Sequence, residues 1–595
     1  MHDLNLGVVG NCSFAALVDR EARVVWACYP RLDGDPVFCA LLDGANSGSF
    51  DVEVAGRARA SQFYQHNTAI LDTVIEDDRG AAVRVTDVVP RFKQFGRVFR
   101  PPTLVRRVMP ERGAPRVRFR LRPRFDYGAS APTITVGSNH VRYVGSHQTL
   151  RLTTDAPVSY VADEATFILD RPLWFLLGPD ETLRGSVSGT GQAFLDQTRG
   201  YWHDWVRFLS VPFDWQDVVI RAAITLKLCS FEESGAVVAA LTTSIPEAPD
   251  SGRNWDYRMC WMRDAYFVVQ ALNRLGATKT MEEFIRYVTN VADLEPDGPL
   301  RPVYPIVPGS ASLESEALAL AGYRGMGPVR IGNAAGDQVQ NDGYGNVILA
   351  ATQMFFDHRL PQAGDAQLFT RLQQLGEQAL ARALQPDAGL WEYRTRQRVH
   401  THSAVMCWAA CDRLAKIAGV LGLADTADRW RAQATRLRAV IVERAWDASL
   451  GSFVDGLGGG HVDASLLLLA ELGFLSPRDP RFIATVDAVT RTLRRGDFLL
   501  RYAADDDFGV PTSAFTICTL WYVDALAALG RLDEARSIFE AVLACRNHLG
   551  LMSEDLEPGT GELWGNFPQS YTHVGLINSA MRLSRSWEEA FWRGW

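Results

Sequence analysis

The sequence lacks three features that would each assign it to a particular class of protein. Its nine cysteines are odd in number, scattered and without CxxC spacing. This argues against a disulfide framework and favours reduced, buried thiols. No apolar run reaches the length needed to span a bilayer. The net charge is −8, so no basic field is present to attract nucleic acid or an anionic membrane.

Residues 1–7 also lack a charged segment followed by a long apolar run, so we expect no signal peptide. The chain has 595 residues and is 47% hydrophobic, which is enough for several cores and excludes a disordered chain. We therefore predict a soluble, cytoplasmic protein of more than one domain. Composition leaves the oligomeric state open, a homo-oligomer included.

Residues 1–195 have the pattern of β-strands. Short apolar runs such as 7–18 and 24–28 are separated by turns rich in Asp, Arg and Glu. The segment Arg116–Arg122 alternates strictly between polar and apolar residues, which is the period of a half-buried strand. Gly137–Asn139 lies between two β-rich runs and predicts a hairpin turn. We predict an antiparallel β-sandwich, and fold alone does not decide whether it contacts substrate or only supports the rest.

The pattern changes before residue 216. Trp202–Leu209 has helical spacing, and Pro212 ends it. We therefore place a helical linker at 196–215 and a helical domain at 216–595. Twelve helices are expected in this domain, at 216–230, 263–275, 278–292, 339–356, 364–384, 401–419, 426–444, 462–472, 480–493, 512–529, 532–545 and 569–584.

A glutamate lies between two aromatic residues just before the helix expected at 401–419. Burial of Glu392 beside Trp391 and Tyr393 would disfavour its charged form. A carboxyl group that stays protonated near neutral pH is what a general acid requires. Far downstream, the acidic loop 550–558 contains Glu554. If folding brings it opposite Glu392, the two carboxyls form the pair used by glycoside hydrolases.

Three segments, in this order, resemble glycoside hydrolase family 15, the glucoamylases and bacterial trehalases: Arg253–Ala265, Leu390–Glu392 and Gly561–Gln569. The resemblance extends from about residue 5 to about residue 585. It implies an N-terminal β-sandwich followed by an all-α (α/α)6 barrel of six inner and six outer helices. Each candidate motif precedes or opens an even-numbered expected helix. If these helices form the inner ring, the motifs meet at one end of the barrel, where helix N-termini present free N–H groups.

The resemblance also implies catalytic roles. Glu392 is the expected general acid and Glu554 the expected general base of an inverting reaction, with the two carboxyls roughly 6.5–9.5 Å apart. The polar neighbours Ser553 and Asp555 favour an ionised Glu554. The sequence does not exclude an exchange of roles between Glu554 and Asp555, and a solvated acidic loop is the structural alternative.

The expected sugar-binding residues lie in the same motifs. Trp261–Asp264 matches the family's Trp-Leu-Arg-Asp segment, so Arg263 and Asp264 resemble the family's clamp on the terminal sugar. A guanidinium and a carboxylate that are held rigid can each form paired hydrogen bonds to adjacent hydroxyls. The alternative is an ordinary ion pair at a helix start. Aromatic rings can stack on the apolar face of a sugar. The further candidates for substrate binding are Trp255, Trp391, Arg501 and Asp342.

These observations favour an exo-acting, inverting α-glucoside hydrolase that releases β-glucose from the non-reducing end of trehalose or short α-gluco-oligosaccharides. We expect neither an organic cofactor nor a catalytic metal, because His400, His402 and His461 lack the spacing of a ligand set. Pro511–Phe515 departs from the family's Pro-Glu-Gly-Ala-Phe, which leaves acceptor specificity open. The alternatives are an α-glucoside phosphorylase-like enzyme, in which phosphate replaces water, and a carbohydrate-binding pseudoenzyme; both glutamates being present favours the hydrolase.

Overall fold

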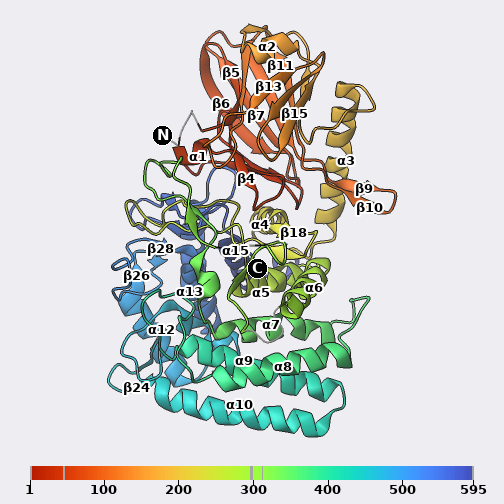
Figure 1. The fold of residues 1–595 in the computed structure, drawn as a ribbon. Helices are drawn as coiled ribbons and strands as arrows, with labels where there is room; N and C mark the ends of the chain where they lie inside the picture. Colours follow the sequence, from red (N-terminus) through yellow and green to blue (C-terminus); the bar gives the residue numbers. More distant parts are fainter. Residues whose placement is uncertain (1–2, 44–46, 295–298, 311–312, 593–595) are drawn as a thin grey trace.

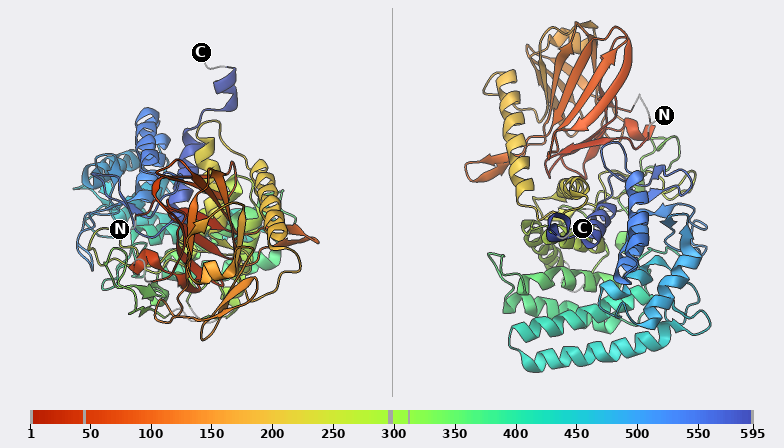
Figure 2. Two further views of the ribbon diagram at one scale, coloured as in Figure 1. Left: turned by 90° about the horizontal axis from the view of Figure 1, so that it is seen from above. Right: turned by 180° about the vertical axis from the view of Figure 1, so that it is seen from behind.

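A computed structural model describes residues 3–43, 47–294, 299–310 and 313–592. An N-terminal part made of antiparallel sheets sits on a larger helical part, as the views in Figure 1 and Figure 2 show. Within the described ranges, no helix is both long and apolar enough to cross a membrane.

The N-terminal part contains two large antiparallel sheets that face one another, and a small hairpin of β9 (Phe92–Gln94) and β10 (Arg97–Phe99). Between them, the rings of Phe119 and Phe175 lie 4.4 Å apart. The strand predicted at Arg116–Arg122 is confirmed as β12, with its apolar side chains buried. The predicted hairpin turn at 137–139 is also confirmed, because the Gly137 N–H donates to the His140 carbonyl at 2.8 Å.

The first sheet has the order β1 (Gly7–Gly10), β2 (Ala15–Val18), β3 (Val24–Tyr29), β5 (Ser49–Val54), β12 and β16 (Phe167–Ile168), with β4 (Asp35–Phe38) paired to β3. The second has the order β13 (Thr133–Val136), β14 (His140–Val144), β15 (Thr149–Thr154), β17 (Leu173–Gly178), β11 (Leu104–Arg112), β8 (Ala82–Val88), β7 (Leu71–Asp77) and β6 (Arg57–Tyr64).

A long helix, α3 (Val187–Arg207), runs beside the sheets toward the helical part (Figure 1). Ser186 caps its first turn by accepting a hydrogen bond from the Gly189 N–H, and Trp202 is completely buried. Strand β17 ends at Gly178, α3 ends at Arg207, and the next helix begins at Gln216.

Each of the twelve helices expected from the sequence overlaps an observed helix. Only the eighth differs in kind, because 462–472 is a 3₁₀ turn at Ala464–Leu467 followed by a short α-helix. A terminal helix, α16 (Trp587–Phe591), was not expected. The twelve are α4 (Gln216–Leu228), α5 (Met262–Arg274), α6 (Lys279–Leu294), α7 (Asp342–Thr352), α8 (Ala366–Arg382), α9 (Thr401–Val420), α10 (Ala424–Ala445), α11 (Leu468–Glu471), α12 (Pro480–Leu493), α13 (Thr516–Ala528), α14 (Leu532–Ala544) and α15 (Ser570–Leu583).

The helices are of two kinds. On α10 the buried residues form one stripe at intervals of three and four (Ala427, Trp430, Ala434, Leu437 and Ile441), as expected for a helix with one face in solvent. By contrast, α9 is buried on all sides from Thr401 to Cys411. Every second helix packs on the next one of this set: α5 packs on α7, α7 on α9, α13 on α15, and α15 on α5. Between α9 and α13, both helices contact the 3₁₀ turn before α11. The loops that precede these helices form the cavity described next.

The N-terminal part also holds one of the cavity-forming loops in place. Arg258 is completely buried, and its guanidinium donates to the Tyr127 hydroxyl at 2.8 Å and to the Gly34 carbonyl at 2.9 Å, both in the N-terminal part. It also forms an ion pair with Asp256 at 2.7 Å. Removing one partner of such a buried pair leaves an uncompensated charge. The segment around Tyr257, which lines the cavity, is therefore anchored from the β-sheet side.

Candidate functional site

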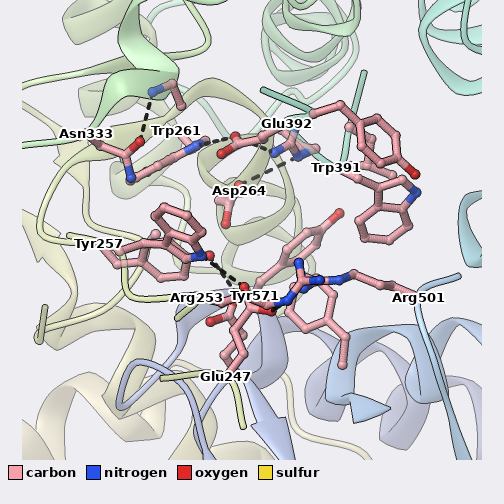
Figure 3. Close-up of a pocket in the computed structure, with 18 of the residues that line it drawn as sticks. Glu247, Arg253, Tyr257, Trp261, Asp264, Asn333, Trp391, Glu392, Arg501 and Tyr571 are labelled. Atoms are coloured by element: carbon pink, nitrogen blue, oxygen red, sulfur yellow. Dashed lines mark hydrogen bonds and ion pairs between the residues drawn. The ribbon is translucent and has the colours of Figure 1, made fainter. Parts of the chain in front are cut away.

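A cavity of about 850 Å³, open to solvent on one side, lies among the loops that precede α5, α7, α9, α13 and α15. Seven of the eight residues that the sequence analysis proposed for the site line it: Trp255, Arg263, Asp264, Trp391, Glu392, Arg501 and Glu554. The eighth, Asp342, does not. Figure 3 shows Glu392 and Trp261 on one side of the cavity, with Glu247 and Arg501 on the other.

Glu392 occupies a tight turn. Its φ is +59°, it follows Gly389 with φ +70°, and its N–H donates to the Gly389 carbonyl at 3.1 Å. Its Oε1 accepts hydrogen bonds from Trp261 Nε1 at 2.7 Å, Gln340 Nε2 at 3.2 Å and Arg263 at 3.3 Å. The carboxyl group therefore faces N–H donors and a cation.

The prediction that Glu392 lies in apolar surroundings was wrong, because its carboxyl group binds Trp261 Nε1 and Arg263. The two aromatic neighbours in sequence turn to other partners. Trp391 donates its Nε1–H to Asp463 at 2.8 Å, and Tyr393 stacks on His400 with the ring planes 14° apart. Adjacent residues in a turn point in different directions, so aromatic neighbours in the sequence did not become neighbours of the carboxyl group.

Glu554 is 1% exposed and lines the cavity. Its Oε1 accepts a hydrogen bond from the Tyr257 hydroxyl at 2.7 Å. Its Oε2 is buried and has no hydrogen-bond partner in the described part of the chain. Burial raises the pKa of Glu554 well above its usual range, and the carboxyls of Asp555 and Glu247 add to this effect.

The prediction that the polar neighbours Ser553 and Asp555 favour an ionised Glu554 was therefore wrong. Those neighbours are buried themselves and make other bonds. Ser553 donates to the Asp555 carbonyl at 2.9 Å, and Asp555 accepts from Ser513 at 2.8 Å. Burial also raises the pKa of Asp555 well above its usual range. Ionising both of two adjacent buried carboxyls that have few hydrogen-bond donors costs a large free energy.

Two aromatic side chains connect the glutamates. The Tyr257 ring, which binds Glu554, is in edge-to-face contact with the Trp261 ring, which binds Glu392, at a centroid distance of 5.2 Å. Each glutamate is thus held by one member of a packed aromatic pair. Tyr257 and Trp261 belong to the motif Arg253–Ala265, but no role was predicted for either of them from the sequence.

Arg263 contacts three carboxyls, at 3.8 Å from Asp264, 3.3 Å from Asp342 and 3.3 Å from Glu392. Burial raises the pKa of Asp264 to about 6, and Arg263 opposes that rise. Asp342 is 1% exposed and also accepts from Asn346 at 3.1 Å. It therefore lies behind Arg263 and orients the guanidinium from outside the cavity.

At the mouth of the cavity, Trp255 donates its Nε1–H to Glu247 at 3.0 Å. The Arg394 guanidinium lies over its ring at 4.4 Å, and Phe508 meets it edge to face at 5.3 Å. Arg253 holds Asp506 through two hydrogen bonds of 2.6 Å. Glu247 was not predicted from the sequence, because its segment carries no periodic or motif signal of its own.

Replacing Glu554 by Gln should stabilise the fold at neutral pH. The pKa of Glu554 is raised in the folded state, so its contribution to stability is present at low pH and is lost as the pH rises through the folded-state pKa. Glutamine does not ionise. We expect the variant's free energy of unfolding to exceed wild type by about 1–3 kcal/mol near pH 8 and by much less near pH 4. Urea denaturation at both pH values measures the free energy of unfolding. An equal difference between variant and wild type at the two pH values would contradict the raised pKa of Glu554.

Comparison with known proteins gives consistent matches. The family model for glycosyl hydrolases family 15 matches residues 214–581, and the model for the trehalase-like N-terminal domain matches residues 5–165. A trehalase of Mycolicibacterium smegmatis is 32% identical, over 98% of this chain and 91% of its own. A trehalase of Thermoplasma volcanium is 30% identical, over 98% and 93%. The crystal structure of a bacterial glucoamylase complexed with acarbose superposes with a TM-score of 0.67 at 12% identity, covering 98% of this chain and 94% of that one.

Proposed function

The chain belongs to glycosyl hydrolases family 15, and on that basis we propose that it is an exo-acting, inverting hydrolase that releases β-glucose from the non-reducing end of trehalose. That it is a glycoside hydrolase follows from the family. The linkage, the exo action and the inversion are our proposal. One observation carries it: two glutamates from segments 162 positions apart line one cavity and bind to one packed aromatic pair.

In this proposal Glu392 is the general acid. It protonates the glycosidic oxygen as the bond to the sugar's anomeric carbon breaks. Its position supports the role, because its side chain is 24% exposed and faces the cavity while Trp261 and Arg263 hold one carboxyl oxygen. The other oxygen has no such bond among the described residues and is free to carry the proton that the leaving group receives.

Glu554 is the general base. It takes a proton from a water molecule that attacks the anomeric carbon on the face opposite the leaving group, which inverts the configuration. The raised pKa makes its carboxylate, once formed, a stronger base than an exposed glutamate. The Tyr257 hydroxyl fixes one oxygen, which leaves Oε2 for the water. We expect the two carboxyls to stand roughly 6.5–9.5 Å apart, the range that leaves room for that water.

Arg263 and Asp264 are proposed to bind the hydroxyls of the terminal glucose at the closed end of the cavity. Both are about as buried as core residues, at 7% exposed. A closed end that recognises a terminal sugar supports exo action, since an internal unit of a chain has no room to continue past it. Trp391 is proposed as a sugar platform, and Trp255 as one toward the mouth, where Arg394 covers part of its ring.

We further propose that residues 216–595 form an (α/α)6 barrel that carries the catalysis, with the β-sandwich of residues 1–195 and the linker at 196–215 as its support. The contacts of α5, α7, α9, α13 and α15 in sequence favour an inner ring. The bonds from Arg258 to Tyr127 and Gly34 favour support by the sandwich.

Trehalose is preferred over longer glucans because both relatives described above are trehalases over nearly their whole length. Short α-gluco-oligosaccharides are the second candidate, favoured by the fold of the bacterial glucoamylase. A phosphorylase is disfavoured by the site itself. Phosphate in the place of the attacking water would meet the carboxyls of Glu554 and Glu247, with Arg501 already paired to Glu247.

A substrate panel with product analysis tests the proposal. Trehalose, maltose, isomaltose, kojibiose and maltotriose are each incubated with the enzyme, and NMR follows the anomers released first. We expect trehalose to be hydrolysed with the highest kcat/KM. Its initial products should be α- and β-glucose in equal amounts, because the attacked unit is inverted and the departing unit keeps its α configuration. Initial release of α-glucose alone would contradict inversion, and no turnover of any of the five would contradict the proposed substrate class.

A further inference from the structure

Glu247 is a cavity carboxyl to which the mechanism above gives no role. It is 2% exposed. Its Oε1 accepts from Trp255 Nε1 at 3.0 Å, and its Oε2 accepts from the Arg501 guanidinium. Arg253 approaches it only to 4.0 Å, because that guanidinium is bound to Asp506. In Figure 3 Glu247 lies beside Arg253 and Arg501, across the cavity from Glu392.

Two further buried carboxyls, those of Glu554 and Asp555, lie close enough to Glu247 to interact with it electrostatically. Asp555 is held by Ser513 through one oxygen, and its other oxygen has no partner in the described ranges. The same holds for one oxygen of Glu554. Arg501 is the cation that acts on both of them. It also lies 5.8 Å from the Phe515 ring, and Phe515 pairs with Asp555 between β28 (Ala514–Phe515) and β29 (Asp555–Leu556).

The balance of charge in this cluster is unequal. Glu247, Glu554, Asp555 and Asp506 are four buried or half-buried acids, and Arg501 and Arg253 are the two cations among them. The Tyr257 and Tyr502 hydroxyls bind Glu554 and Asp506 and are neutral donors. With Arg253 bound to Asp506, three carboxyls face the single guanidinium of Arg501.

Resting on the proposed hydrolysis, we propose that Glu247 is a positioning residue for the base: it holds Arg501 and Trp255 in place and keeps that guanidinium from pairing with Glu554 or Asp555. Glu247 touches neither reacting atom. Its function is to hold the Arg501 guanidinium, so that Glu554 forms no salt bridge with any described residue and stays a strong base.

The electrostatics of the site agree with this role. Asp555 and Glu247 both raise the pKa of Glu554, and Arg501 lowers it. If Glu247 lost its charge, two effects would act in the same direction. The repulsion from Glu247 would vanish, and Arg501 would be free to turn toward Glu554 and Asp555. Both changes lower the proton affinity of Glu554, which weakens it as a base.

The test is the pH profile of kcat/KM for trehalose, which reports ionisations of the free enzyme. In Glu247→Gln, the amide oxygen can still accept from Trp255, but the charge is lost. We expect the acidic limb to move to lower pH by about one unit, with kcat at the plateau reduced about tenfold and KM changed less than about threefold. Arg501→Gln should move the acidic limb to higher pH, because it removes the cation that lowers the pKa of Glu554.

The matched control is Asp463→Asn, which removes a buried carboxyl that holds another cavity tryptophan, Trp391, in the same manner. Its acidic limb should stay where it is in wild type. An unmoved limb in Glu247→Gln, or shifts of the same sign in Glu247→Gln and Arg501→Gln, would overturn the proposal. If Glu247→Gln does not fold by circular dichroism, the sign of the Arg501→Gln shift decides alone. Wild type that hydrolyses none of the α-glucosides would instead refute the proposed function.

Discussion

Replacing Glu554 by glutamine should lower kcat on trehalose by about 10²–10⁴-fold with little change in KM. The amide keeps the shape of the side chain and can still accept the Tyr257 hydroxyl that Glu554 accepts at 2.7 Å. It cannot take a proton from water, so the attacking nucleophile is not activated. Glucose release under saturating trehalose measures kcat. The same variant should be more stable than wild type at neutral pH, so loss of activity cannot be assigned to unfolding.

The matched control for this prediction is Asp555→Asn, which changes the neighbouring buried carboxyl. Asp555 accepts from Ser513 and has no contact with Tyr257 among the described residues, so it is not held in the same way. We expect this variant to retain more activity than Glu554→Gln. If Asp555→Asn were instead the more severe of the two, the base would be Asp555, an exchange of roles that the sequence alone does not exclude.

The sequence was informative wherever a local pattern determines structure. Alternation in Arg116–Arg122 predicted a strand whose Val117, Phe119 and Leu121 are buried. Helical spacing predicted α9 and α10, although it did not separate a helix buried on all sides from one with an exposed face. The family motifs identified residues that the fold does bring to one cavity, because each motif directly precedes or opens a buried helix.

The sequence was uninformative about properties that arise only when distant segments meet. Glu554 is surrounded by polar neighbours in the chain, but it is burial by the rest of the fold that raises its pKa. Asp342 opens α7, whose preceding loop lines the cavity, and nevertheless lies behind Arg263. Glu247 belongs to a segment without a pattern, and only the approach of Arg501, 254 positions away, gives it a place in the site. Burial and pairing of this kind are tertiary quantities that no single window contains.

Replacing Glu392 by glutamine should produce a loss that depends on the leaving group. On trehalose we expect kcat/KM to fall by about 10²–10⁴-fold, because the glucose oxygen must be protonated as it departs. On 4-nitrophenyl α-glucoside, or on α-glucosyl fluoride, the loss should be smaller by about tenfold or more, since these groups depart without a proton. The isosteric amide can still accept from Trp261 Nε1, which preserves the turn that positions residue 392.

Glu554→Gln is the control that makes this comparison specific. Water must be activated whatever group leaves, so that variant should lose activity on trehalose and on the activated substrates to a similar degree. The ratio of the two losses therefore separates an acid from a base without reference to absolute rates. A Glu392→Gln variant that loses both activities equally would mean that Glu392 acts through Arg263, which lies 3.3 Å from its carboxyl, and only orients the sugar clamp. We expect the larger ratio of the two losses for Glu392→Gln, because in the proposed mechanism Glu392 protonates the oxygen of the bond that breaks. Glu554 acts on water at the opposite face of the sugar.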